Sequence, residues 1–233
     1  RVTSMLSTQS TTLLRPPWLS LARAAWLIIS AAAVIAFIAE LNIVLRAPLQ
    51  DCTDPAVLCG PWHVGQGDIA LGEALNIPAQ LLLFVYFFNS VFPRIAFLLV
   101  GLVIFMRRSD DWIALMLSLM LTTFVVEGVQ NLGNFMPVVH LIYAVATAAF
   151  VLLPFVFPSG RIVPGWMAWI VPPLLVATLF AILSPYLGIQ INEQIYAILS
   201  LGAFFPWFLT GGYAAIYRYR RVSANVERQQ TKW

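Results

Sequence analysis

Long apolar segments separated by short polar ones make up most of this chain. A bilayer core of about 30 Å needs about 20 apolar residues in a helix, and six segments approach or exceed that length. They lie at about 21–45, 77–106, 112–132, 136–157, 166–186 and 195–217. The pattern predicts an all-α polytopic membrane protein with six transmembrane helices.

The second apolar segment is too long for one upright span and too short for two. As a single helix, residues 76–106 would be about 46 Å long, which exceeds the bilayer core. One interpretation divides them into a short interfacial helix at 77–88 in the outer loop region and a span at 89–106, with Pro93 near its first turn. The other is one tilted or kinked helix. The pattern leaves both open.

Composition supports a membrane protein. The chain is 61% apolar and 10% charged with a mean hydropathy of +0.85, well outside the range of soluble domains. Its formal charge of +3 could suggest a nucleic-acid partner, but the cations lie at the ends of the spans. Membrane orientation explains that placement better than phosphate contact does, so the expected partner is the lipid bilayer and not nucleic acid.

The positions of the cations orient the predicted bundle. Lysine and arginine stay on the cytoplasmic side of a membrane, and every one except Arg46 and Arg94 falls there if both termini are cytoplasmic. The chain then divides into a cytoplasmic segment at 1–20, a membrane domain at 21–217 with an outer loop at 46–76, and a cytoplasmic tail at 218–233. The cations of this basic tail are Arg218, Arg220, Arg221, Arg228 and Lys232.

The outer loop contains both cysteines, Cys52 and Cys59. This orientation places them in an oxidising compartment, where a disulfide between them would contribute about 2.5 kcal/mol in the chain-entropy model. Metal binding by the cysteines and His63 is the alternative, although the spacing matches no standard zinc pattern and a fourth ligand is missing. We expect the disulfide.

No catalytic or cofactor motif accompanies the spans. The sequence has no glycine-rich phosphate loop, HExxH, C-x-x-C-H or paired catalytic carboxylates, and its two histidines cannot supply a bis-histidine haem site in the core. We therefore expect no enzyme and no metal or cofactor of its own. Lipid or quinone could lie along the apolar surface.

Three ionisable residues fall at one depth within the predicted spans. Counted from the cytoplasmic ends at 1.5 Å per residue, Glu40, Arg94 and Glu127 all lie about 20 Å across the core. Pairing of Arg94 with either carboxylate would remove much of the cost of burial, and His140 at the start of the fourth span could join them. We expect a polar cluster of these four residues, either as a structural ion pair or as a ligand-binding or proton-sensing site.

Short polar sequences at the cytoplasmic ends carry a family resemblance. They are MRRSDDWIAL at 106–115, FPSGRIVPGW at 157–166 and YRRVSANVERQQTKW at 219–233. Together with the two-cysteine outer loop, they resemble the membrane-embedded input region of certain bacterial sensor histidine kinases. The resemblance implies a sensor-like scaffold in the bacterial inner membrane, with any further membrane helix and kinase domain beyond Trp233.

Two functions follow from these observations. The first is a non-enzymatic signalling input module, in which an event at the outer loop or polar cluster moves the segment from Arg218 to Lys232. The second is an accessory structural subunit of a larger membrane complex, such as a respiratory or photosynthetic electron-transfer assembly. Other membrane subunits or a second copy of the chain would be the protein partners. A transporter is less favoured, because no repeat and no polar group near the midplane suggests a substrate route.

Overall fold

The computed structural model describes residues 12–46, 66–129, 132–157, 160–184, 189 and 192–221. Within these ranges the chain is all-α, with seven α-helices and three short 3-10 helices. The α-helices are α1 (Trp18–Arg46), α2 (Gln66–Ala74), α3 (Ala79–Arg108), α4 (Trp112–Thr123), α5 (Met136–Val156), α6 (Val171–Leu183) and α7 (Glu193–Arg221). The 3-10 helices are η1 (Phe124–Val126), η2 (Gly133–Phe135) and η3 (Gly165–Trp169).

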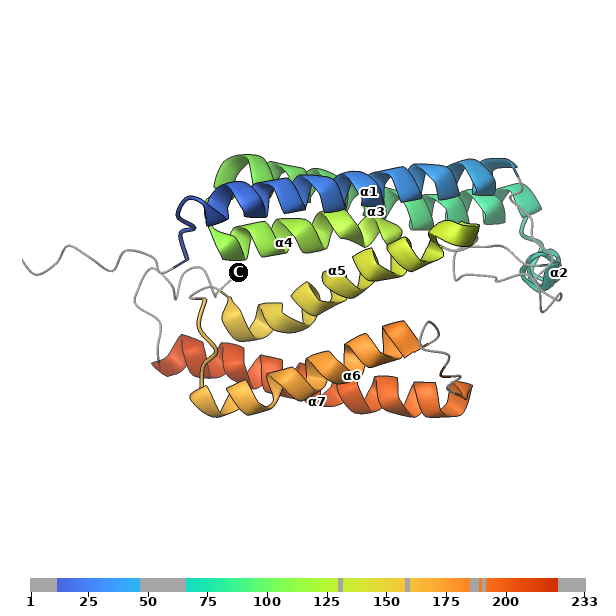
Figure 1. The fold of residues 1–233 in the computed structure, drawn as a ribbon. Helices are drawn as coiled ribbons and strands as arrows, with labels where there is room; N and C mark the ends of the chain where they lie inside the picture. Colours follow the sequence, from blue (N-terminus) through green and yellow to red (C-terminus); the bar gives the residue numbers. More distant parts are fainter. Residues whose placement is uncertain are drawn as a thin grey trace, which may run out of the picture.

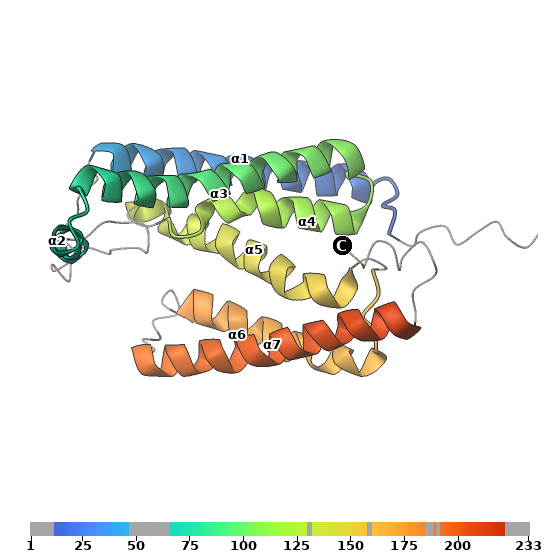
Figure 2. The same cartoon turned by 180° about the vertical axis from the view of Figure 1, so that it is seen from behind.

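Six of the helices lie side by side, and the short α2 lies across one end of them (Figure 1). Helices α1, α3 and α4 form one side of the bundle, α6 and α7 form the other, and α5 lies between the two groups (Figures 1 and 2). We call the end that carries α2 the α2 end. The opposite end, where α1 begins and α7 finishes, is the Arg218 end.

The buried apolar side chains form two clusters, one on each side of α5. The first joins α1, α5 and the region of η1, and the second joins α5, η3, α6 and α7. The first contains Ala33, Ala36, Phe37, Val125, Val126, Val129, Val139 and Ile142. The second contains Val151, Phe155, Met167, Val171, Leu174 and Ala214. Helix α5 contributes to both clusters and therefore connects the two halves of the bundle.

Four helical segments of the described residues are long and apolar enough to cross a membrane. They are Trp18–Ile43, Gln80–Arg108, Gly133–Val156 and Gly165–Leu183. Large apolar side chains point outward from them and from α7, among them Ile28, Ile35, Val176, Phe208 and Leu209. An apolar exterior of this extent suits contact with lipid and is typical of a multi-pass membrane protein.

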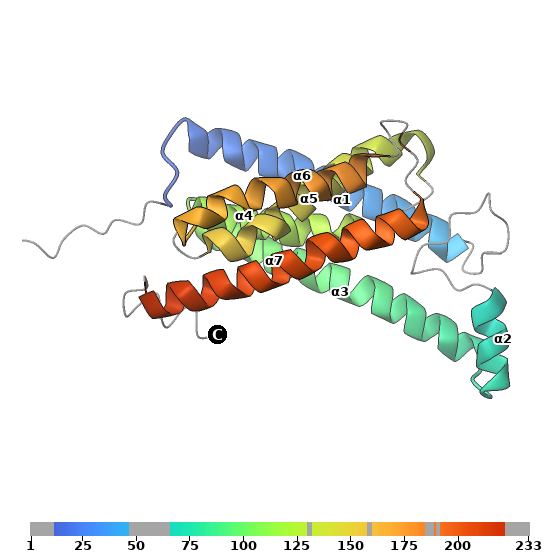
Figure 3. The ribbon, with the colours of Figure 1, turned by 90° about the horizontal axis from the view of Figure 1, so that it is seen from below.

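The structure decides between the two interpretations of the second apolar segment. Residues 79–108 form one continuous helix, α3, with Pro93 inside it. The interpretation with a separate interfacial helix at 77–88 is therefore wrong, and the alternative of one helix is confirmed. At 1.5 Å per residue α3 is about 45 Å long, and its first half diverges from the other helices to reach α2 (Figure 3). The short helix of this region is α2, which lies within the segment expected to be the outer loop.

The third predicted span is shorter than expected. We predicted a helix over 112–132, but α4 ends at Thr123 and one 3-10 turn, η1, extends the helical segment only to Val126. The helical segment from Trp112 to Val126 is shorter than the four of membrane-spanning length. Three hydroxyl side chains near its end, Ser118, Thr122 and Thr123, are fully buried.

Helices α3 and α4 approach closely at Gly101. The Ser118 hydroxyl of α4 donates a hydrogen bond to the Gly101 carbonyl at 2.7 Å, and the Thr122 hydroxyl lies 2.9 Å from that of Ser30 on α1. A Cβ atom on Gly101 would lie 2.7 Å from Thr122 Cγ2 and 3.0 Å from the Ser118 carbonyl oxygen. Small residues permit this kind of contact between membrane helices, and hydroxyl groups add hydrogen bonds across it.

Replacing Gly101 with alanine should lower the free energy of unfolding, although alanine normally has a higher helix propensity than glycine. The overpacked contact should cost about 1–3 kcal/mol of the free energy of unfolding, measured by detergent titration in mixed micelles. Gly202 on α7 is the matched control, because a Cβ there meets no atom within 4 Å. Gly202→Ala should be neutral or stabilising by up to about 1 kcal/mol. Equal effects of the two substitutions would contradict the close approach.

Candidate functional site

A buried ion pair joins α1 to α3 near the α2 end of the bundle. Arg94 Nη1 lies 3.1 Å from Glu40 Oε2, and the two side chains are only 5% and 6% exposed. The expected contact between Arg94 and a carboxylate is therefore present, and the carboxylate is that of Glu40. Because both charges are removed from water, each depends on the other for compensation.

Arg94 also bonds to the segment that follows α4. Its Nη2 donates to the main-chain carbonyl of Glu127 at 2.5 Å, and its guanidinium carbon lies 5.7 Å from the centre of the Phe37 ring on α1. Glu127 thus takes part through its backbone, whereas its side chain is half-buried. One arginine therefore links α1, α3 and the end of η1.

The local fold explains why the Glu127 carbonyl is available. The helix has already ended, so this oxygen has no amide four residues later in a continuing helix to bond with. The 3-10 turn closes with a bond from Glu127 N to Phe124 O at 3.1 Å, and Gly128 then reverses the chain at a φ of +74°. Glu127 was expected inside a helical span, and this expectation is wrong because the helical segment ends at Val126.

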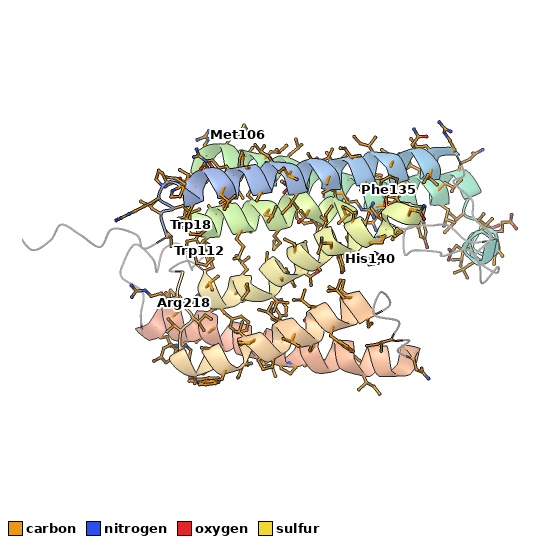
Figure 4. All side chains as sticks on the ribbon, in the orientation of Figure 1. Trp18, Met106, Trp112, Phe135, His140 and Arg218 are labelled. Atoms are coloured by element: carbon orange, nitrogen blue, oxygen red, sulfur yellow. The ribbon has the colours of Figure 1, made fainter. Side chains whose placement is uncertain are left out.

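His140 lies at the same end of the bundle, near the start of α5 (Figure 4). Its Nδ1 lies 2.9 Å from the carbonyl oxygen of Met136, one turn earlier in the same helix. This contact ties the ring to its own helix, so the place of His140 in the expected four-residue cluster stays a prediction. Cys52, Cys59 and His63 lie outside the described residues, and the expected disulfide also stays a prediction.

At the Arg218 end, Asp111 connects the chain's early residues to α4. Its Oδ1 accepts hydrogen bonds from the amides of Ile113 at 2.9 Å and Ala114 at 3.4 Å, which makes it the N-cap of α4. Its Oδ2 accepts a bond from the Thr12 hydroxyl at 3.0 Å. Trp112 N also donates to the Thr12 carbonyl at 3.0 Å. Thr12, in the described segment before α1, is thereby bound to the turn between α3 and α4.

Removing this cap should destabilise the bundle. Asp111→Ala should lower the free energy of unfolding by about 1–2 kcal/mol, because two helix amides and the Thr12 hydroxyl lose their acceptor. The neighbouring Asp110 is exposed and uses its main-chain carbonyl to accept from Leu14 N. Asp110→Ala should therefore have an effect below about 0.5 kcal/mol in the same detergent titration. A larger loss for Asp110 would contradict the capping role.

Gly160 brings the turn after α5 against the same residues. It has a φ of +74°, in the left-handed region that favours glycine. An added Cβ would lie 3.1 Å from Thr12 Cγ2 and 3.2 Å from the Trp112 ring. Gly160 therefore lies closely against Thr12 and the Trp112 ring.

Arg218 then attaches α7 to this turn. Its Nη2 donates to the main-chain carbonyls of Phe155 at 2.5 Å and Arg161 at 3.3 Å. Its Nη1 donates to the Phe157 carbonyl and lies 3.5 Å from the Pro154 carbonyl oxygen. The last carbonyls of a helix lack intrahelical partners and carry partial negative charge, so a guanidinium at the end of α5 is favourable.

Arg218 was expected in a basic tail that follows the last span, but the structure places it within the last helix. It lies inside α7 and is 2% exposed, whereas Arg220 is exposed. Helix α7 continues to Arg221, and Arg228 and Lys232 lie outside the described residues. Arg218 and Trp112 lie at the same end of the bundle in Figure 4.

We call the set of Thr12, Asp111, Trp112, Gly160 and Arg218 the junction. Through these contacts it connects the segment before α1, the start of α4, the residues at and after the end of α5, and the last turn of α7. Asp111 could have been recognised from the sequence as a capping residue directly before an apolar run. The role of Arg218 had no comparable sequence signal, because its partners are main-chain carbonyls more than 50 residues away.

Nothing in the described residues forms a metal site, since no group of three or more histidine, cysteine, aspartate or glutamate side chains lies close enough together. Comparisons with protein-family models, curated proteins and solved structures find no match. The structure contains two buried polar centres at opposite ends of the helical bundle, the Arg94 and Glu40 pair and the junction. Each centre holds together helices that are distant in sequence.

Proposed function

We propose that this chain is a non-enzymatic input module of a membrane sensor, of the kind that precedes the signalling domains of bacterial histidine kinases. The observation that supports it most is the attachment of α7 by Arg218 to the end of α5. A sensor needs the helix that leads to its output segment to follow the state of the bundle. The junction supplies such a connection.

The proposed topology has six spans with both termini in the cytoplasm of a bacterial cell and the membrane domain in the inner membrane. Four of these spans are the segments of spanning length, and the other two are α4 with η1 and α7. Exposed arginines favour the Arg218 end as the cytoplasmic one. They are Arg15, Arg23, Arg107, Arg108, Arg161 and Arg220, against Arg46 at the α2 end.

The proposed mechanism begins at the Arg94 and Glu40 pair. A ligand or a proton that separates the two side chains changes the contact between α1 and α3 and releases the carbonyl of Glu127. The segment from η1 to Val129 packs in the same apolar cluster as α5, so its movement is passed to that helix. Arg218 then transfers a shift of α5 to the end of α7. Interfaces between packed helices commonly change by about 1–2 Å in such transitions.

The test is the intact mass of the native polypeptide from purified membranes, with the identities of the proteins that co-purify in fixed ratio. The sensor proposal expects a polypeptide in which a kinase or other signalling domain follows residue 233, or a separate signalling protein bound to it. Stoichiometric association with the subunits of an electron-transfer complex, without a signalling domain, would overturn the proposal in favour of an accessory subunit.

A further inference from the structure

Two exposed arginines flank the contact between α1 and α3. The two helices run in opposite directions (Figures 1 and 2), and the rings of Trp26 on α1 and Phe105 on α3 stack at 3.8 Å with an interplanar angle of 11°. Arg23 lies three residues before Trp26, and Arg108 lies three residues after Phe105. Both are therefore about 4.5 Å closer to the Arg218 end than the stacked rings.

The helical positions also place these arginines on facing sides. Residues three apart lie on the same side of a helix. Arg23 therefore lies on the same side of α1 as Trp26, and Arg108 lies on the same side of α3 as Phe105. The rings stack on each other, so the two arginines flank the same α1 and α3 contact. Both are exposed and can extend their guanidinium groups toward one point above the rings.

The local charge at this point is uncompensated by protein in the described part of the chain. No ion pair or hydrogen bond there joins the Arg23 or Arg108 side chain to a carboxylate. Asp111 is occupied by the cap of α4 and by Thr12, which leaves the exposed Asp110 as the nearest acid along the chain. Two like charges held at one level repel each other, and an anion between them would remove that repulsion.

The first turn of α1 also exposes apolar side chains, on the side of the helix away from Arg23. A shallow hollow of about 510 Å³ is lined by Pro17, Trp18, Ser20 and Leu21. The Trp18 side chain is 67% exposed and that of Leu21 is 61% exposed. Tryptophan with arginine at the end of a long apolar helix is typical of the depth at which lipid headgroups lie.

We propose that Arg23 and Arg108 bind the phosphate of an acidic phospholipid. A guanidinium binds phosphate oxygens with two parallel hydrogen bonds, and its long stem can reach from an apolar surface to the headgroup level. The lipid would bridge α1 and α3 near the start of α4. This inference requires a bilayer and holds for either a sensor or a subunit.

The test is the thermal unfolding midpoint of the delipidated chain in neutral detergent, with added phosphatidylglycerol or phosphatidylcholine. Phosphatidylglycerol should raise the midpoint by about 2–4 °C, and phosphatidylcholine should not. Arg23→Gln and Arg108→Gln should each abolish most of this shift, and the double variant should lose no more than either one. Without lipid, either variant should be unchanged or slightly more stable, because the repulsion is relieved.

Arg46→Gln, at the other end of α1, is the matched control and should keep the full shift. The proposal is overturned if both lipids act equally, or if the control loses the shift as Arg23→Gln does. It is also overturned if inorganic phosphate at millimolar concentration reproduces the shift, since the site would then take a soluble anion. Native mass spectrometry should show one tightly held phosphatidylglycerol on the wild type and none on the double variant.

Discussion

Replacing Arg94 with leucine is expected to lower the free energy of unfolding by about 3–5 kcal/mol, one of the two largest losses predicted for this chain. The substitution leaves the Glu40 carboxylate buried without its cation, and it removes the donor that bonds the Glu127 carbonyl. Both groups lie within the bundle, where water cannot readily replace the missing partner. The measurement is unfolding by detergent titration in mixed micelles, followed by loss of helical circular dichroism.

Two further variants separate the ion pair from a general loss of packing. The double variant Arg94→Leu with Glu40→Leu should recover most of the stability, because apolar replacement of a whole buried ion pair is often close to neutral. Glu127→Gln should cost less than about 1 kcal/mol, since Glu127 contributes its main-chain oxygen. A double variant as unstable as Arg94→Leu would mean that the pair does not account for the loss.

The second large effect is expected at Arg218. Arg218→Ala should lower the free energy of unfolding by about 3 kcal/mol, because hydrogen bonds to a charged group contribute more than neutral ones and several carbonyls lose their donor together. The affected oxygens belong to Phe155, Phe157 and Arg161, at the end of α5 and in the turn after it. Detergent titration of the purified chain measures this loss.

Arg220 provides the matched control, since it is an exposed arginine two residues further along α7. Arg220→Ala should change stability by less than about 0.5 kcal/mol. Arg218→Lys should recover only part of the loss, because an ammonium group cannot present two parallel donors to separate carbonyls as a guanidinium does. Equal effects at the two arginines would show that the burial of Arg218 is unimportant for stability.

The longest helices could be predicted from the sequence because their apolar runs approach the length that a bilayer requires. The predicted spans at 21–45, 136–157 and 195–217 correspond to α1, α5 and α7 within a few residues. The division of α3 failed for a physical reason. A bilayer limits the apolar length of an upright helix, but a helix can extend past the bundle, and Pro93 does not end it.

The polar sites were predictable only in part. The pairing of Arg94 with either Glu40 or Glu127 followed from the rule that an ionisable group inside a span needs a partner. The structure identifies the partner carboxylate as that of Glu40. The role of the Glu127 main chain could not be predicted, because it depends on where α4 ends. Arg218 was misjudged because a cation at the end of a span usually faces solvent, and only the fold reveals the carbonyls of α5 beside it.

The proposed coupling between the two buried centres can be tested most directly by a distance measurement across the Arg218 end. Spin labels at Met106→Cys on α3 and Tyr219→Cys on α7, both exposed, would report it by double electron–electron resonance in nanodiscs, with Cys52 and Cys59 replaced by serine. Glu40→Gln removes one charge of the distant ion pair. Unchanged circular dichroism would verify that this variant is folded.

If the two buried centres are coupled, Glu40→Gln should move the mean distance by about 2 Å or broaden its distribution. The same substitution should have no effect when Arg218→Ala has already detached α7. Distance distributions that superimpose with and without Glu40→Gln would contradict the coupling, and the two polar centres would then be independent structural contacts.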